Sequence, residues 1–289
     1  MKKKKDLDLA PSRRERKTLG QYILLFFLVL YTLFCALPIV LVFVAAFSDE
    51  KTIVQNGFSF IPKKWSLDGI NAVLRYGKQL ATSYGVTIFI TVVGTLVGLL
   101  IMAMFAYSIS RKDFMLGKFL SVYLLIPMLF SGGQLSCYII YTSMYGLKDN
   151  IALLILPLCV STMNVIILRT YIANSIPGEL MEAAKIDGCN TLKTLWYVIV
   201  PMLKPSLVSC ALFQFMWTNN DFQGPLIYIA DMDKYTNSVY LRMSMDGDVG
   251  FQWNRILAMS LISIIPSLVV FFCAQDSFID GIAAGGVKG

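Results

Sequence analysis

The chain has 289 residues, of which 56% are hydrophobic and 15% charged, and it contains no histidine. Soluble domains carry about 25% charged residues, so this composition excludes an ordinary soluble enzyme. The lack of histidine excludes histidine acid–base catalysis and histidine metal ligands. The six cysteines form no CxxC pair and lie mostly in apolar runs. We therefore expect no disulfide framework, no metal site and no cofactor bound by this chain.

The formal net charge of +7 is concentrated at the start of the chain, where residues 1–19 hold eight of the 25 lysines and arginines. A basic segment before an apolar run is a topology signal in membrane proteins. Nothing beside it resembles a nucleic-acid reading module, so we expect no nucleic-acid partner.

Six windows of about 20 residues are nearly free of charge, which is the helix length that a bilayer core requires. Only the fifth window contains a charged residue, Asp221. The windows are 20–48, 80–110, 119–146, 150–168, 205–230 and 256–275. They predict an all-α membrane protein with six transmembrane helices over 20–275, preceded by a basic arm (1–19) and followed by a tail (276–289).

Orientation follows from the positive charges, because cytoplasmic loops are enriched in lysine and arginine. With the N-terminus inside, the cytoplasmic segments hold 16 of these residues and the outer segments nine. We expect both termini in the cytoplasm and two large outer loops, at about 49–79 and 231–255. Within the first loop we expect an irregular stretch and then a short helix near 68–80.

The cytoplasmic connection between spans four and five, about 174–203, reads as a helix, a turn and a second helix. Pro177 suits the first turn of a helix, and Glu179 is favoured there by the helix dipole. Gly188 is placed to end that helix with a positive φ. Thr191 is a candidate cap for the second helix, which we expect to run to Pro201.

Leu180, Ala183, Ala184 and Asp187 share one face of the first helix, by their spacing. The paired alanines form a flat strip that another surface can approach closely. Asp187 lies at the helix C-terminus, where the dipole disfavours an acid. Two interpretations stay open: Asp187 has a partner elsewhere, or its side chain caps the next turn.

This segment resembles the EAA loop of ABC importer permeases, through Glu182-Ala-Ala-Lys-Ile-Asp-Gly188 and Val198-Ile-Val-Pro201. The stretch Thr218–Ile227 resembles the Asn-Trp-Asn-Asp-Phe motif of the carbohydrate-uptake branch, with Asn219 in place of the tryptophan. The end of the chain, Gly281–Gly289, resembles the tail of the second maltose-type permease subunit. The resemblance covers about 20–289.

The resemblance implies that the first helix is a coupling helix that docks on a cytoplasmic ATPase subunit. The implied coupling residues are Glu182, Ala183, Ala184, Asp187, Gly188 and Pro201. The tail residues implied as a second ATPase contact are Gly285, Gly286, Val287, Lys288 and Gly289. No GxxxxGK[ST] phosphate loop is present in the sequence, so ATP and its magnesium ion are expected on the partner ATPase.

The resemblance further implies a noncatalytic permease subunit in a bacterial cytoplasmic (inner) membrane. Its implied partners are a second homologous permease, two ATPase subunits, an external solute-binding protein, membrane lipid and a sugar or oligosaccharide. ATP-driven closure of the ATPases would rock the bundle between inward-open and outward-open states.

Polar residues on the fifth span are candidates for the substrate pathway, since polar groups in membrane helices usually face the bundle interior. They are Gln214, Trp217, Thr218, Asn220 and Asp221. Three classes of substrate stay possible: a neutral sugar, an acidic uronate oligosaccharide and a sugar-phosphate type of solute. An ion-coupled secondary transporter is the competing class, but it requires more intramembrane acids or an inverted repeat.

Overall fold

A computed structural model of the chain describes residues 19–75, 77–111, 113–245 and 252–286, and these form helices joined by turns. In chain order the elements are α1 (Leu19–Ala46), α2 (Glu50–Asn56), α3 (Asp68–Arg75), α4 (Gly77–Ser110), α5 (Gly117–Leu129), α6 (Gln134–Ile139), η1 (Ile140–Met144), α7 (Ala152–Ile155), η2 (Leu156–Cys159), α8 (Thr162–Ser175), α9 (Gly178–Ile186), α10 (Thr191–Thr194), η3 (Leu195–Ile199), α11 (Val200–Asn219), α12 (Gln223–Tyr228), η4 (Met232–Lys234), α13 (Asn237–Met243) and α14 (Trp253–Gly286).

Among the described residues, four helical segments are long and apolar enough to cross a membrane: α1, α4, the continuous segment Thr191–Asn219 and the first part of α14. Two bent pairs raise the number to as many as six if each counts as one span. The first pair, α5 with α6 and η1, bends by 113°, and the second, α7 and η2 with α8, by 40°. The predicted all-helical architecture is therefore confirmed over the described residues, with between four and six spans.

Three predicted spans have different boundaries in the structure, and one of them, 150–168, is bent by 40° and extends to Ser175. The window 119–146 is interrupted after Leu129, where the chain turns through Gly133, whose φ is +79°. The window 205–230 ends early, because α11 stops at Asn219 and the separate helix α12 follows. The backbone N–H of Gly224 donates to the carboxylate of Asp221 at 3.3 Å, which helps to start α12 as an element of its own.

Contrary to expectation, the second helix does not end at Pro201. The chain is helical without interruption from Thr191 to Asn219, and Pro201 lies in the first turn of α11, directly after the π-helical turn η3. Proline cannot donate a backbone hydrogen bond, and a wider π turn is one way for a helix to accommodate that loss. The predicted second helix and the predicted fifth span are thus one continuous helix.

The segment expected as an irregular outer loop contains a helix that the sequence analysis did not predict, α2. The expected short helix near 68–80 is present as α3, which ends at Arg75, and α4 begins at Gly77.

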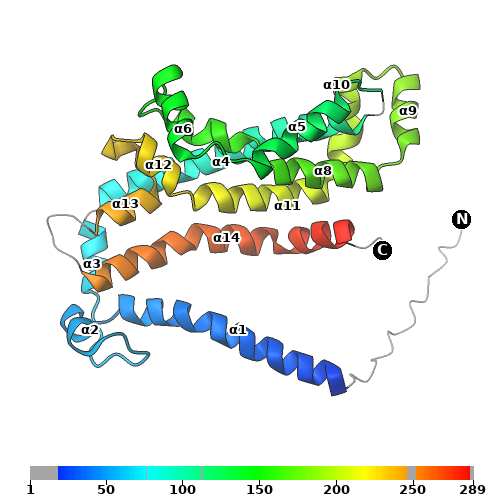
Figure 1. The fold of residues 1–289 in the computed structure, drawn as a ribbon. Coiled ribbons are helices and arrows are strands. Elements are labelled where there is room, and N and C mark those ends of the chain that lie inside the picture. Colours follow the sequence, from blue (N-terminus) through cyan, green and yellow to red (C-terminus); the bar gives the residue numbers. More distant parts are fainter. Residues whose placement is uncertain (1–18, 76, 112, 246–251, 287–289) are drawn as a thin grey trace, which may run out of the picture.

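Two main clusters of buried side chains hold the bundle together. One lies between α4, α8 and the Thr191–Asn219 helix, and it includes Met102, Leu168 and Ile199. The other joins the end of α1 to α3, α4, α13 and α14. Figure 1 shows α1 along one edge of the bundle beside α14, and the only buried residues of α1 are Val44, Ala45 and Ala46.

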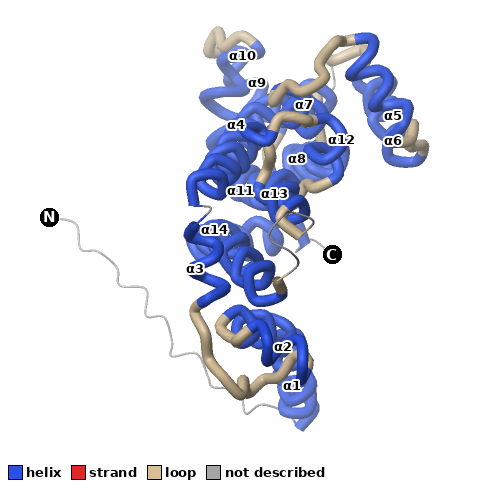
Figure 2. The backbone as a smooth tube through the Cα atoms, turned by 90° about the vertical axis from the view of Figure 1, so that its left-hand side faces the viewer, coloured by secondary structure: helices blue, strands red, loops and turns tan. Residues whose placement is uncertain are grey.

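The bundle has two distinct ends, which we call the α9 end and the α3 end. Figure 1 shows α9, α10, the start of α1 and the end of α14 at the α9 end, whereas α2, α3, α12 and α13 lie at the α3 end. Figure 2, turned by 90°, shows that α5 and α6 project to one side of the bundle.

Candidate functional site

Glu179 lies in the first turn of α9, as the sequence predicts, whereas Pro177 is the extended residue just before the helix and not part of its first turn. The helix ends in a Schellman turn, in which the N–H of Cys189 donates to the carbonyl of Ala184 at 2.9 Å and the N–H of Gly188 donates to that of Lys185 at 3.2 Å. Gly188 has a φ of +78°, which confirms the predicted left-handed helix end. The turn reverses the chain and brings α10 back toward the bundle.

The cap of α10 is Asn190, not Thr191. The side-chain oxygen of Asn190 accepts the backbone N–H of Lys193 at 2.8 Å. The hydroxyl of Thr191 instead accepts a hydrogen bond from the guanidinium of Arg111, 80 residues earlier in the chain, at 2.7 Å. The predicted role of Thr191 is therefore wrong, and the residue joins α10 to the end of α4.

The two alanines of α9 do not form one exposed strip. Ala184 is only 6% exposed because it faces the rest of this chain, whereas Ala183 is exposed beside Glu182. Asp187 and Gly188 are exposed as well, at the far end of the helix. The surface that α9 offers to another molecule thus carries Glu182, Ala183, Asp187 and Gly188, while Ala184 lets α9 pack closely on its own bundle.

Asp187 does not cap the next turn. Within the described part of the chain its carboxylate accepts no hydrogen bond, and Asn190 supplies the cap of α10 instead. An acid at a helix C-terminus gains nothing from the helix dipole. The interpretation that Asp187 has a partner in another molecule stays a prediction.

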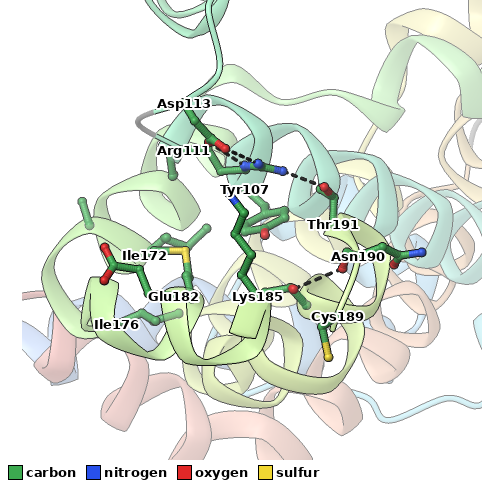
Figure 3. Close-up of a pocket in the computed structure, with 15 residues that line it drawn as sticks. Tyr107, Arg111, Asp113, Ile172, Ile176, Glu182, Lys185, Cys189, Asn190 and Thr191 are labelled. Atoms are coloured by element: carbon green, nitrogen blue, oxygen red, sulfur yellow. Dashed lines mark hydrogen bonds and ion pairs between the residues drawn. The ribbon is translucent and has the colours of Figure 1, made fainter. Parts of the chain in front are cut away.

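A cleft of about 690 Å³ lies between α9 and the adjoining ends of α4 and α8. Figure 3 shows Arg111 on one wall, between Asp113 and Thr191, and Glu182 and Lys185 of α9 on the other. The hydrogen-bonded guanidinium of Arg111 holds the pKa of the Asp113 carboxyl below its usual value, and the charge of Lys185 adds a smaller effect in the same direction. The cleft is lined by charges of both signs.

The floor of this cleft is part of the main core. Tyr107 of α4 and Ile172 and Ile176 near the end of α8 line the cleft, and all three belong to the buried cluster that also contains Ile199. Packed cores transmit displacement because they have little free volume. Arg111 and Thr191 connect the turn after α9 to the end of α4, and the same turn leads directly into the Thr191–Asn219 helix.

The five candidates for the substrate pathway do not all lie on one side of α11. Gln214 and Thr218 are 3% and 2% exposed. The Gln214 side chain donates to the carbonyl of Leu158 at 2.5 Å and accepts from Asn164 at 3.5 Å. These contacts explain why a polar side chain is buried at position 214: it is hydrogen-bonded within its own chain.

The other three candidates lie at or beyond the exposed side of α11. Trp217 is 73% exposed and shares its face with the exposed Phe213. The amide of Asn220 donates to the carbonyl of Met216 at 2.8 Å, and Asp221 accepts from Gly224. Of the five, Trp217 is the side chain best placed to contact another molecule.

Sequence reasoning missed Arg111, because its partner Thr191 is too distant in the chain for any local pattern to connect them. It also missed a network at the α3 end. There the carboxylate of Asp149 accepts the N–H groups of Ala230 and Asp231, both at 3.1 Å, and bonds the ammonium of Lys234 at 3.0 Å. Lys234 also pairs with Asp231 at 3.2 Å. A φ of +59° at Asp149 is the local mark of this tight turn.

The tail candidates fall at the limit of the described chain. Gly285 and Gly286 are the last residues of α14, and Val287, Lys288 and Gly289 lie outside the described residues. Among the residues that can be assessed, no three metal-binding side chains gather.

The chain matches one protein family over residues 82–279, the binding-protein-dependent transport system inner membrane component. A polygalacturonan/rhamnogalacturonan transport system permease of Bacillus subtilis is 31% identical over 91% of this chain and 96% of its own length. An arabinooligosaccharide transport system permease of Halalkalibacterium halodurans is 28% identical over 87% of this chain and 91% of its own.

The fold is also similar to a solved structure, a bacterial ABC transporter involved in the import of the acidic polysaccharide alginate. The TM-score is 0.78 at 25% identity, over 91% of this chain and 99% of the matched chain.

Proposed function

This chain belongs to the binding-protein-dependent transport system inner membrane component family, and on that premise we propose that it is one of two permease subunits of an ATP-driven oligosaccharide importer. It provides half of the translocation pathway and hydrolyses no ATP itself. Its partners are a second permease, two ATPase subunits that bind ATP and magnesium, and an external solute-binding protein. Both termini and α9 face the cytoplasm.

The observation that carries this proposal is the construction of α9. A short helix with Glu182, Ala183, Asp187 and Gly188 exposed is held at its far side by the buried Ala184. It continues through a tight turn into a single helix that runs from Thr191 to Asn219. An ATPase that moves α9 would therefore tilt a helix long enough to cross the membrane, which is rigid-body coupling.

For the substrate we propose an acidic, uronate-type oligosaccharide ahead of a neutral one. The support is that two similar proteins carry names that specify acidic polymers, polygalacturonan/rhamnogalacturonan and alginate. The arabinooligosaccharide permease is a similar protein with a neutral sugar, so a neutral oligosaccharide is the second candidate. Trp217 is proposed to contact the sugar, because an exposed indole face suits a sugar ring.

The experiment is purification of the tagged chain from its native membrane, followed by reconstitution of what co-purifies. The proposal expects an ATPase, a second permease and ATP-dependent uptake that rises with oligogalacturonate more than with arabino-oligosaccharides or sugar phosphates. Uptake by the chain alone, driven by an ion gradient, would overturn the proposal and favour a secondary transporter. Uptake that prefers the neutral sugar would contradict the proposed acidic substrate and leave the importer proposal intact.

The matched variants are Ala183→Trp and Lys148→Trp. The first places a bulky ring on the exposed side of α9, and the second places it in the turn that precedes α7 at the α3 end. We expect Ala183→Trp to lose the ATPase on purification while it keeps the second permease, and Lys148→Trp to keep both. Retention of the ATPase and of uptake by Ala183→Trp would contradict docking at α9.

A further inference from the structure

The first helix, α1, is long and apolar enough to pass through the hydrocarbon core of a membrane. It has 28 residues, and at 1.5 Å per residue it is about 42 Å long, which exceeds a hydrocarbon core of about 30 Å. Charged residues begin at Asp49, just after α1, and charges are excluded from the core, so the Ala46 end of α1 reaches the headgroup layer. Whatever is bonded to the residues just after Ala46 lies at that same depth.

The segment Gly57–Leu67, which we call the aromatic loop, is bonded there. Ser48 and Trp65 form an isolated antiparallel bridge. The N–H of Ser66 donates to the carbonyl of Phe47 at 2.8 Å, and the N–H of Asp49 donates to that of Lys64 at 3.1 Å. Figure 1 shows this loop folding back beside the α3 end of α1.

The aromatic loop exposes large apolar side chains that none of the described residues covers. Ile61 is 83% exposed, Trp65 62% and Phe60 50%. Lys63 and Lys64 lie between them and bond to Asn56 and Asp49, which keeps both ammonium groups at the surface. Tryptophan at the membrane surface and lysine beside it are typical of segments that lie in the interfacial layer.

We propose that the aromatic loop is a lipid anchor: Phe60, Ile61 and Trp65 enter the headgroup layer, and Lys63 and Lys64 face its phosphates. Lipid is favoured as the occupant because the exposed loop continues the apolar surface of α1, where Phe43 is 51% exposed. The two lysines also complement phosphate charge. The inference rests on the membrane location of the family and not on the proposed substrate or ATPase.

The anchor is connected to the start of α14 through α2. The two carboxylate oxygens of Glu50 accept the backbone N–H groups of Trp253 and Asn254 at 3.0 and 2.9 Å. Phe58 packs edge-on against Trp253, with 5.1 Å between ring centroids. Lipid that holds the aromatic loop therefore fixes the position at which α14 begins.

The test uses the whole complex in lipid bilayers, with a nitroxide attached at Ile61→Cys or at the control Lys148→Cys in a variant without the six native cysteines. Collision rates are measured with oxygen, which concentrates in lipid, and with a water-soluble nickel complex. The anchor predicts a higher oxygen-to-nickel ratio at residue 61 than at residue 148. Equal ratios, or low access of both agents to residue 61 because protein covers it, would overturn the proposal.

A second measurement keeps the native cysteines. Tryptophan fluorescence is compared for the wild type and Trp65→Phe, each in plain bilayers and in bilayers with lipids brominated near the headgroup. The anchor predicts that bromolipid quenches the fluorescence of the wild type more than that of Trp65→Phe, because the variant lacks the tryptophan that contacts lipid. If bromolipid quenches both proteins equally, Trp65 does not contact lipid and the proposal fails.

Discussion

The guanidinium of Arg111, just beyond α4, donates to the hydroxyl of Thr191 at 2.7 Å and so ties α4 to the first residue of α10. The same guanidinium forms an ion pair with Asp113. This contact lies at the open cleft beside α9, where the chain changes direction after Gly188. It is the polar link between the segment proposed to meet the ATPase and a helix on the other side of the cleft.

Removal of that link should uncouple movement of α9 from α4. We expect Thr191→Val, which removes the hydroxyl, to lower transport per ATP hydrolysed, whereas Thr191→Ser should retain it. A hydrogen bond to a charged donor contributes about 1.5–3 kcal/mol. The measurement is uptake and ATP hydrolysis in proteoliposomes that contain the complete complex. Equal coupling ratios for Val and Ser would show that the bond transmits nothing.

Gly188 should be sensitive because of its backbone. Its φ is +78°, and no atom lies within 4 Å of an added Cβ, so a side chain meets strain but no clash. A residue with a branched side chain costs about 1–2 kcal/mol in this region, and asparagine costs less. We expect Gly188→Val to reduce uptake strongly and Gly188→Asn to preserve most of it, at equal amounts of protein in the membrane. The reverse order would contradict a conformational role.

Gln214 and Trp217 should separate stability from transport. Gln214→Leu leaves the carbonyl of Leu158 and the amide of Asn164 without this partner, and each buried group left unpaired costs about 1–3 kcal/mol. We expect a lower melting temperature and an unchanged KM. Trp217→Ala, at an exposed position, should raise the KM for the oligosaccharide and leave the melting temperature unchanged. A raised KM in Gln214→Leu, with no change in Trp217→Ala, would instead place the substrate pathway on the buried side of α11.

The network at the α3 end should depend on pH. The bond to Lys234 keeps the pKa of Asp149 below 3.8, and the bond to Asp149 keeps that of Lys234 above 10.5. Because the pKa of Asp149 is lowered in the folded protein, its ion pair stabilises the fold fully at a pH above the usual pKa of the acid. This stabilisation is lost as the pH falls through the lowered pKa. Because the pKa of Lys234 is raised, its contribution to stability is complete at a pH below the usual lysine pKa. This contribution is lost as the pH rises through the raised pKa.

The full stabilisation is therefore expected between pH 3.8 and 10.5. Asp149→Asn keeps the turn, because asparagine tolerates the φ of +59°. We expect this variant to melt below the wild type at neutral pH and the difference to vanish at strongly acidic pH. Melting curves of the purified complex check this, and a constant difference at every pH would exclude the ion pair as its cause.

The helices and the end of α9 could be predicted because each depends on local chemistry. Long apolar runs form membrane helices, and a glycine after a short amphipathic helix ends it with a positive φ. The cap of α10 could not be assigned in the same way, because Asn190 and Thr191 are neighbours that both favour a cap, and Thr191 is engaged by the distant Arg111.

The burial of particular side chains required the tertiary structure. Ala183 and Ala184 are equivalent in sequence, yet only the first is exposed, since α9 leans on its own bundle through the second. Gln214 and Thr218 share one face of α11 by spacing, but spacing does not reveal whether that face meets a pathway or the neighbouring α4 and α8. The bend after Leu129 was missed because both of its arms are apolar.

A photoreactive amino acid at Ala183 in the complete complex tests whether α9 is the docking element for an ATPase. We expect a cross-link to the ATPase subunit from Ala183, and none from the same amino acid at Lys148. A cross-link from Ala183 to lipid or to the second permease, with none to an ATPase, would contradict it.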